Sequence, residues 1–491
     1  MQNMVPELLI YWMAASIKAC KMKIKNILFL GIFMSFLVGH TQDTYTLEKC
    51  SDIAFENNFD LKGVKLRAGS SKVNLNQSWG DIMPNINGNY NIGINNGRSI
   101  DTFTNGYINQ QLTFSNAGLS AGLPIFNGFR LKNAIKQSYL NLKASEMEVE
   151  EAKQNLTVRV TLAYLQVLNM RDLLELNSAR LEVTQKQVNR LSVLYKEGQG
   201  NPANYTDMKG QLANDEVAVI SSKNSLKQSI ADLFLLLGLD SDYNASFEDI
   251  DPLRDFATYP MTDDEIYNEA ILNLATFKAK ELRQDAAKSA VSVVKAGFTP
   301  QISLFGQLNT NYSSAAQLFT ETGTTIVNTG DFVDVNGQQY NVMTNQPQYE
   351  SSDIGYRDQL DNNLSSSYGL AVSIPLFNGF RAKNNVKLSK IALEESQVEL
   401  QSTKFQYKQS IELAYADMEA ALGKYQTLEQ QVDAFEESFR VNEIRFNNGV
   451  SNVIEYIISK NNLDNAKQNL SMARYEYVLR TKILDYYRGD F

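Results

Sequence analysis

The sequence predicts an internally duplicated chain that combines a membrane β-barrel with a long α-helical barrel. Three observations predict this fold class. The segment Leu123–Asn133 returns almost unchanged at Ile374–Asn384. Several short stretches alternate every second residue like amphipathic strands, and much longer stretches have a seven-residue apolar period. The 491 residues are therefore better described as one duplicated unit than as several unlike domains.

The composition narrows the possible classes of function. Of the residues, 43% are hydrophobic and 21% charged, which is ordinary for a folded protein. The formal net charge is −9 and no cluster of Lys and Arg interrupts the acidic balance, so a nucleic-acid partner has no electrostatic support. The chain has one histidine, two cysteines and no Gly-rich phosphate loop. We expect no catalytic residues, no cofactor and no metal, and hence no enzyme.

The first 42 residues have the outline of a secretory signal peptide. Lys23 and Lys25 precede the apolar run 27–38, which small and polar residues follow. A transmembrane anchor is the competing interpretation, but this run is shorter than the roughly 20 residues that a span needs. Met22 is an alternative start, which would make residues 1–21 an upstream extension. We therefore expect residues 1–42 to direct export.

The repeat divides the exported chain into two copies. The first copy is 43–239, the second is 262–491, and a linker at 240–261 joins them. The second copy carries an insertion rich in Asn, Thr, Gln, Ser and Gly. Because this insertion has no helical apolar period, the segment 310–363 is predicted to be a surface loop.

Each copy contains two predicted strands. In the first of them Asn87 and Asn89 alternate with Ile86 and Ile92, which places polar and apolar side chains on opposite faces. Strands of about ten residues have the length expected of tilted membrane strands. A soluble sheet with one wet face is the alternative, although little else in the chain could cover the apolar face. The predicted strands are 85–95, 112–124, 301–309 and 364–375.

Two long helices follow each pair of strands. No proline interrupts the stretch from Asn127 to Glu197, about 70 residues that would extend roughly 105 Å as helix. Gly198 and Gly449 interrupt the apolar period at matching places in the two copies. Each copy is thus predicted to be a helical hairpin attached to a pair of strands. The predicted helices are 126–197 and 204–237 in the first copy, and 377–446 and 452–487 in the second.

Four strands cannot close a barrel, and an open sheet edge in lipid leaves backbone groups unpaired at several kcal/mol each. Closure must therefore involve other chains. Three chains would supply twelve antiparallel strands, which is a permitted even number. We expect a homotrimer that forms a 12-stranded β-barrel and, from the helical hairpins, a coiled-coil α-barrel. The asparagine-bearing strand face would line a water-filled lumen.

The sequence FNGFR occurs at 126–130 and again at 377–381, each time after a strand that ends at proline, and ARYEYVLRTKILDYYRG occupies 473–489. Together with the glycines in the middle of each hairpin, these features resemble the TolC-like outer membrane efflux (outer-membrane factor) family. The resemblance covers nearly the whole exported chain. It implies an outer-membrane channel subunit of a tripartite efflux or type I secretion system, with the helical barrel in the periplasm.

The resemblance also implies the partners of this passive export duct. They are two further copies of the chain, outer-membrane lipid, a periplasmic adaptor (membrane fusion) protein, and an inner-membrane transporter of the RND or ABC class. A soluble periplasmic coiled-coil scaffold or adaptor is the alternative function. It would share the long helices, but it would not explain two amphipathic strand pairs in each chain.

The resemblance assigns one group of residues to the junctions between barrel and helices. Prolines at strand ends would mark these transitions, and the Phe-Arg pairs after them would pack or anchor at the lipid headgroups. They could also be ordinary turn residues and the first turn of each helix. The junction residues are Pro84, Pro124, Phe129, Arg130, Pro300, Pro375, Phe380 and Arg381.

A second group would lie at the periplasmic tip, where family members close the tube with tyrosine, arginine and aspartate side chains. Here Phe446 stands in place of the tyrosine, Ser451 in place of the arginine, and Ile458 in place of a second carboxylate. A gate built on the same salt bridges is therefore not expected. Glu455 keeps a carboxylate, which in three copies could form an acidic ring that favours cations, or could simply be solvated. The other candidate tip residues are Gly198, Tyr205 and Gly449.

Overall fold

The computed structural model describes residues 44–100, 105–109, 111–250 and 258–490. They form two compact units, and each unit takes segments from both sequence repeats. The first unit contains the residues up to Gly63, Glu151–Leu274 and those from Tyr407 onward; the second contains Val64–Glu150 and Ala275–Gln406. The expected signal peptide and part of the expected linker lie outside the described residues.

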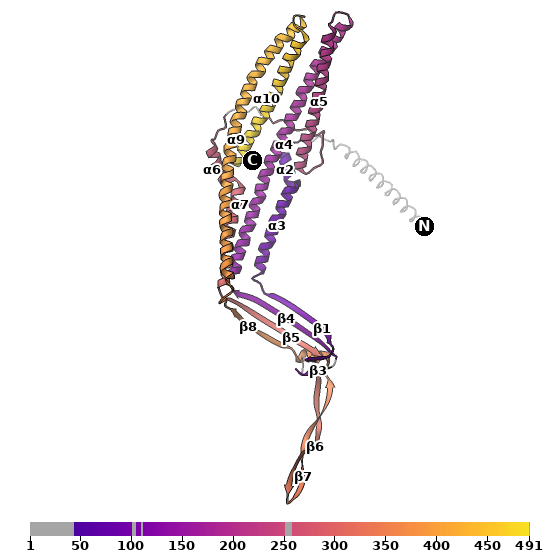
Figure 1. Ribbon diagram of the computed structural model, residues 1–491, viewed down its shortest axis with the longest axis vertical. Coiled ribbons are helices and arrows are strands. Elements are labelled where there is room, and N and C mark those ends of the chain that lie inside the picture. Colours follow the sequence, from indigo (N-terminus) through magenta and orange to yellow (C-terminus); the bar gives the residue numbers. More distant parts are fainter. Residues whose placement is uncertain (1–43, 101–104, 110, 251–257, 491) are drawn as a thin grey trace, which may run out of the picture. The chain divides into compact units, whose positions relative to one another are not determined.

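The second unit contains a four-stranded antiparallel sheet in the order β1-β4-β5-β8 (Figure 1). Strands β1 and β4 belong to the first repeat, and β5 and β8 to the second, so the duplication appears as two adjacent strand pairs. In this single chain β1 and β8 form the two edges of the sheet. The strands are β1 (Asn85–Asn95), β4 (Leu112–Phe126), β5 (Gln301–Ser313) and β8 (Ser365–Ser373).

The strand register gives this sheet one polar and one apolar face, as the alternation predicts. Residues directly opposite each other in antiparallel strands point to the same face. Asn87 lies opposite Ser120 and belongs to the polar face. Ile92 lies opposite Ser115 on the other face, which carries most of the aliphatic side chains. The large apolar side chains of that face include Ile86, Tyr90, Ile92, Ile94, Leu119, Leu304, Leu308, Tyr368, Leu370 and Val372.

The prediction of a surface loop at 310–363 was wrong. After the end of β5, this segment forms a second antiparallel pair, β6 (Gln317–Val335) and β7 (Gln338–Asp353), and a short helix, α8 (Tyr356–Asn362). Asn336 and Gly337 connect the pair with φ of 55° and 82°. Asn-Gly is the preferred pair for such a two-residue turn. The period-two signal is weak here because both faces of these strands are rich in polar residues and largely exposed.

A smaller hairpin, β2 (Arg98–Ile100) and β3 (Tyr107–Asn109), lies between β1 and β4. The described part of the chain therefore has more strands than the four predicted. Only four of them, however, join the main sheet. The main sheet therefore has the four strands that the sequence predicts.

Four long helices make up most of the remaining chain. They are α4 (Arg130–Lys196), α5 (Pro202–Leu237), α9 (Arg381–Asn447) and α10 (Val453–Arg488). The first helix of each pair has 67 residues and the second has 36 in both repeats. Among the described residues, no helix combines the length and the apolar character that a membrane crossing requires. The two repeats therefore match in the lengths of their long helices as well as in sequence.

Shorter helices were not predicted. They are α2 (Leu47–Asn57), α3 (Phe59–Gly80), α6 (Asp263–Asn273), α7 (Ala275–Lys295) and the 3₁₀ helix η1 (Ala296–Phe298). Their start signals are nevertheless present, because Thr46 caps α2 and Thr262 forms a capping box with Glu265 at α6. Two of these helices have only 11 residues, too few to show a heptad period.

The end of α5 provides a direct test of packing in the first unit. Gly238 is the left-handed C-cap residue of α5 with φ of 67°, and a Cβ atom there would lie 2.8 Å from the Asn57 carbonyl oxygen. We expect Gly238→Ala to lower the free energy of unfolding by more than about 1 kcal/mol. Gly210→Ala in the same helix, where a Cβ meets nothing within 4 Å, should instead stabilise by up to about 1 kcal/mol. Thermal unfolding followed by circular dichroism compares the two, and equal melting temperatures would contradict the packing.

Candidate functional site: helical tips and junctions

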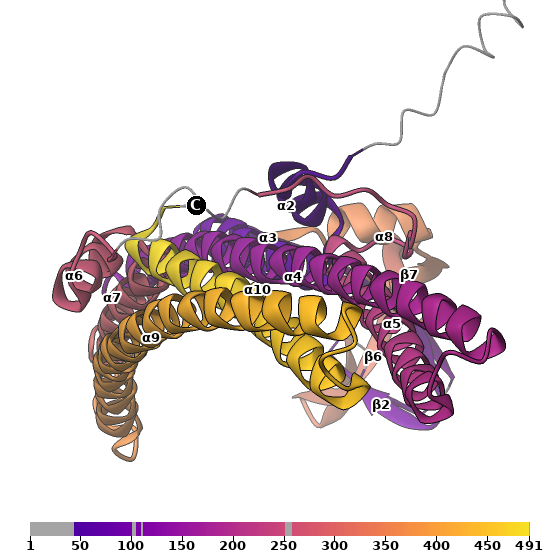
Figure 2. The ribbon, with the colours of Figure 1, turned by 90° about the horizontal axis from the view of Figure 1, so that it is seen from above.

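The two helical hairpins turn at matching glycines. Gly198 follows α4 with φ of 75°, and Gly449 follows α9 with φ of 72°. The Gly198 amide donates to the Tyr195 carbonyl, and the Gly449 amide to the Phe446 carbonyl, each at 3.1 Å. Figure 2 views the hairpins from the end at which they turn. The predicted tip glycines therefore make the same left-handed turn in both repeats.

An aromatic pair spans each of these turns. Tyr195 stacks on Tyr205 with ring centroids 5.6 Å apart, and Phe446 stacks on Tyr456 at 4.8 Å. The first pair lies largely at the surface, with Tyr195 47% exposed, whereas Tyr456 is fully buried. Burial raises the pKa of Tyr456 to about 12. The same pair thus has a different environment in each repeat.

Tyr456 is buried because the two hairpins meet around it. It forms an apolar cluster with Val188 of α4, Met208 of α5 and Val453 of α10. Phe446 packs against the edge of this cluster, as do Phe439, Leu194, Tyr205, Leu212 and Ile457. In the sequence, Phe446 is notable only because it lacks the hydroxyl group of a tyrosine. In the structure its ring is part of the apolar contact between the hairpins.

The polar tip residues mostly contact their own hairpin. The Ser451 hydroxyl donates to Glu455 at 2.6 Å, and Arg445 lies 3.9 Å from the same carboxylate. Glu455 also lies in the first turn of α10, where Asn452 accepts its backbone amide. Across to the other hairpin, Arg190 donates to the side chain and the carbonyl of Asn447. Glu455 is about half exposed, so its charge is available to solvent.

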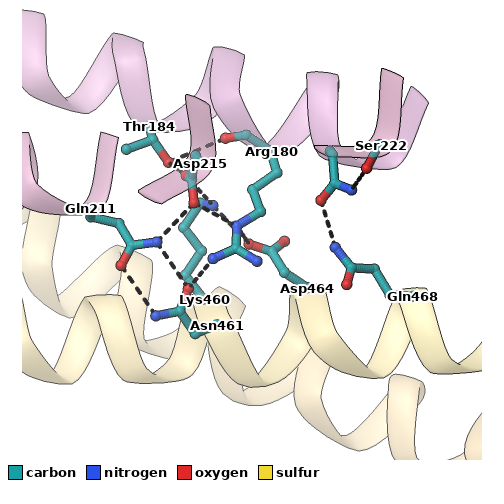
Figure 3. A network of polar contacts seen from close by, with 10 residues as sticks. Arg180, Thr184, Gln211, Asp215, Ser222, Lys460, Asn461, Asp464 and Gln468 are labelled. Atoms are coloured by element: carbon teal, nitrogen blue, oxygen red, sulfur yellow. Dashed lines mark hydrogen bonds and ion pairs between the residues drawn. The ribbon is translucent and has the colours of Figure 1, made fainter. Parts of the chain in front are cut away.

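A cluster of four charged residues lies within the helices, away from the turns (Figure 3). We call Arg180 of α4, Asp215 of α5, and Lys460 and Asp464 of α10 the charge cluster. Arg180 Nε lies 2.7 Å from Asp215 and 3.3 Å from Asp464. Lys460 Nζ lies 2.7 Å from Asp464 and 3.7 Å from Asp215. Two positive and two negative groups therefore neutralise each other.

The charge cluster is buried and its oxygens are satisfied by further donors. The side chains of Asp215 and Lys460 are 0% and 4% exposed. Asp215 accepts from the Thr184 hydroxyl at 2.5 Å and from the Gln211 amide at 2.8 Å. A buried ion pair adds little net stability, but removing one partner typically costs about 3–5 kcal/mol because the other charge stays buried. The cluster thus fixes how α10 lies against α4 and α5.

Further hydrogen bonds continue this contact between the hairpins. Asn177 of α4 donates to Ser222 of α5 and accepts from Gln468 of α10, both at 2.6 Å. The Tyr475 hydroxyl donates to Asp172 at 2.6 Å, and burial raises the pKa of this tyrosine above its usual range. This row of contacts, which Figure 3 shows in part, was not predicted from the sequence.

The junction residues repeat their geometry as closely as the tips do. Phe129 and Phe380 both have φ of 61°, a left-handed conformation that is uncommon for a bulky residue. Each contacts the first Phe of its FNGF motif edge-on, with ring centroids 5.6 Å apart. Both remain exposed, at 62% and 60%. Arg130 and Arg381 are the first residues of α4 and α9.

The prolines lie at or beside the strand ends. Pro84 and Pro300 directly precede β1 and β5, and Pro375 follows β8. Pro124 lies inside β4, next to a shift in register with β5. Beyond Gly122, β4 no longer pairs with β1, so the missing amide of Pro124 interrupts no ladder on that side. The period of two begins after Pro84 and Pro300, and it gives way to the period of seven after Pro124 and Pro375.

No group of His, Cys, Asp and Glu suited to hold a metal ion occurs among the described residues.

The family described as Outer membrane efflux protein matches residues 51–239 and 266–485, one segment within each sequence repeat. Outer membrane protein TolC of Vibrio cholerae is 21% identical over 465 residues, which cover 92% of both chains. Outer membrane efflux protein BepC of Brucella suis is 21% identical over 404 residues, covering 82% of this chain and 76% of BepC.

The fold agrees with these similarities. The crystal structure of the Campylobacter jejuni CmeC outer membrane channel superposes with a TM-score of 0.72 at 16% identity, over 90% of this chain and 85% of CmeC. The protein is accordingly a channel of the outer membrane that acts in transport and is not an enzyme. With the family matching both repeats, this chain belongs to the outer membrane efflux protein family.

Proposed function

We propose that this chain is the outer-membrane subunit of a tripartite efflux or type I secretion system and forms a passive export duct across the periplasm. The observation that carries the proposal is the four-stranded sheet with one polar face, one apolar face and two unpaired edges. In lipid those edges require partner strands. Three chains with four strands each give a 12-stranded barrel whose polar face lines the lumen.

The proposed partners follow from a duct that has no energy source of its own. A periplasmic adaptor would connect the hairpin tips to an inner-membrane transporter of the RND or ABC class, and that transporter would choose the cargo. The exported protein would keep residues 43–239 and 262–491 as its two repeats, after removal of residues 1–42 as a signal peptide. The junction residues at each FNGFR motif would lie where the barrel meets the helices.

Membrane fractionation and gel migration test this proposal. The duct should be found in the outer-membrane fraction and should run as a trimer that dissociates to monomer on heating. Reconstitution in planar bilayers should give discrete conductance steps. A monomer in the periplasmic extract that forms no pores would instead support a periplasmic scaffold, the alternative function.

We further propose that the hairpins of one chain are held together in the closed duct by two contacts. One is the apolar cluster around Tyr456, and the other is the charge cluster. This arrangement differs from a gate of tyrosine, arginine and aspartate at the turn, because Phe446 and Ser451 cannot take those roles. Opening the duct would require Lys460 and Asp464 to separate from Arg180 and Asp215.

Glu455 is proposed to act on the permeating ions rather than on closure. Its carboxylate is about half exposed near the turn, and three copies in a trimer would form an acidic ring. We expect Glu455→Gln to lower the permeability ratio of cations to anions without a change in trimer stability. The reversal potential across a KCl gradient measures this ratio. Glu437→Gln, which removes an exposed carboxylate of α9, is the control and should leave the ratio unchanged.

A further inference from the structure

Among the described residues, the hairpin of β6 and β7 is the element in which the two repeats differ most. Its two strands have 19 and 16 residues, whereas the equivalent hairpin of the first repeat, β2 and β3, has three residues in each strand. In β6 and β7 every residue is exposed except Val327 and Val342, which are half-buried. The hairpin therefore has no core of its own.

The base of the hairpin is firmly attached to the main sheet through α8. Gln359 is 1% exposed; its side-chain amide donates to the Ser313 carbonyl at 3.0 Å, and its oxygen accepts the Ser313 amide at 2.9 Å. The Thr310 hydroxyl donates to the Leu360 carbonyl at 2.6 Å. Tyr356 also lies within hydrogen-bonding distance of Tyr90 on β1. The hairpin is thus anchored at its base, although nearly all residues of its two strands are exposed.

Both faces of the hairpin carry exposed apolar side chains, but three of its four aromatic rings, Phe319, Phe332 and Tyr349, share one face. The register places Phe319 on the same face as Ser351, and Tyr349 on the same face as Glu321. The apolar residues of this face are Phe319, Ile326, Phe332, Met343 and Tyr349, each at least 55% exposed. We call them, with the carboxylates Glu321 and Asp353 on the same face, the hairpin face. Contiguous apolar side chains of this kind commonly mark an interaction site.

The hairpin is also strongly acidic. No Lys or Arg occurs from Gln301 to Tyr356, whereas β6 and β7 contain five carboxylates. Such a hairpin lacks the edge lysines that usually keep strands from pairing with other chains. Packing the hairpins of several copies together would place carboxylates against carboxylates, which is unfavourable. A positively charged occupant would instead find both apolar contacts and opposite charge. The carboxylates are Glu321, Asp331, Asp334, Glu350 and Asp353.

We propose that the hairpin face is a docking site for a basic, extended polypeptide segment that carries Lys or Arg and apolar residues on the same side of its strand. The apolar residues of the segment cover Phe319, Ile326 and Tyr349. Its cationic groups lie against Glu321 and Asp353, while its backbone can extend the open strand edge. This binding role lies beyond the transport function and does not depend on which cargo passes through the duct.

The test uses the full chain in detergent and two labelled peptides, the Lys-Val peptide with the repeat Lys-Thr-Val-Thr and the Glu-Val peptide with the repeat Glu-Thr-Val-Thr, so that the charged residue and Val lie on one side of an extended strand. Fluorescence anisotropy should show binding of the Lys-Val peptide only. The double variant Glu321→Gln/Asp353→Asn should weaken that binding roughly tenfold, and Phe319→Ser/Tyr349→Ser should weaken it at least as much. Glu350→Gln, on the opposite face of the same hairpin, is the matched control with a smaller effect. Gel migration of the trimer confirms that each variant is folded.

Two results would overturn the proposal. One is equal binding of the Lys-Val peptide to a chain in which a short Gly-Ser connection replaces residues 317–353. The other is efficient disulfide formation between copies that carry Thr324→Cys, because the hairpins would then cover one another. Loss of binding in the first experiment and no cross-link in the second would support a basic occupant. Neither result depends on whether the chain conducts ions.

Discussion

Ile92→Lys should prevent the chain from assembling in the outer membrane. Ile92 lies on the apolar face of β1 and is 68% exposed in the single chain, which is the face that meets lipid in the proposed barrel. A lysine on the lipid side of a membrane strand costs up to roughly 2–4 kcal/mol near the bilayer centre and less near its surface. In a trimer the cost is incurred three times. Trimer yield in outer-membrane fractions, measured by gel migration without heating, should fall strongly.

The matched change is Asn87→Leu on the same strand. Asn87 lies on the polar face opposite Ser120, so a leucine there would face the proposed lumen and meet water rather than lipid. We expect this variant to assemble in nearly normal amounts, with altered conductance at most. Equal assembly of the two variants would contradict the assignment of the faces, and a larger defect in Asn87→Leu would reverse it.

Lys460→Met should have the second large effect, in the helical part of the chain. It leaves Asp215, which is 0% exposed, and Asp464 with Arg180 as the one remaining cation of the charge cluster. Breaking a buried charge pair in this way typically costs about 3–5 kcal/mol. Because the cluster joins α10 to α4 and α5, we expect a lower melting temperature together with longer open times in planar bilayers.

Lys467→Met provides the control on the same helix. Lys467 pairs with Glu436 at 3.0 Å, and both side chains are substantially exposed. Exposed pairs contribute about 0–1 kcal/mol, so this variant should resemble the unmodified protein in both measurements. If Lys460→Met also behaved like the unmodified protein, the charge cluster would have no part in holding the hairpins together.

The sequence predicted the main elements well because two independent periods marked them. The strand predicted at 85–95 has the same bounds as β1, and the helix predicted at 204–237 ends where α5 ends. The apolar period changes beside Pro84, Pro124, Pro300 and Pro375. Because this change depends only on neighbouring residues, a single sequence is sufficient to predict where strands and helices meet. The face assignment of Asn87 and Ile92 followed from the same alternation.

The charge cluster could not be predicted in the same way because it depends on how three helices face one another. Arg180 and Asp464 look like ordinary charges on the surface of a helix. One signal was nevertheless present. Asp215 follows Leu212 by three residues, and Lys460 precedes Leu463 by three, which places both charges on the apolar stripes of their helices. A charge at such a position requires a buried partner.

The hairpin of β6 and β7 was missed for a different reason. Its two strands pair with each other and are almost entirely exposed, so the alternation of buried and exposed residues that usually marks a strand is absent. Only Asn336-Gly337 gave a direct sign of a hairpin. The Asn-Gly pair is therefore more informative than the overall composition of the segment, which is typical of a loop.

The long helices have the same lengths in both repeats, 67 and 36 residues. This match restricts which insertions and deletions the chain can accommodate. A deletion of two helical turns from α4 would move Gly198 out of step with Gly449 and would carry Arg180 away from Lys460. The same deletion in α9 would restore the match between the turns. Insertions and deletions in the long helices should therefore occur together in both repeats. The length of the helical part of this channel then changes only when both hairpins change by the same number of residues.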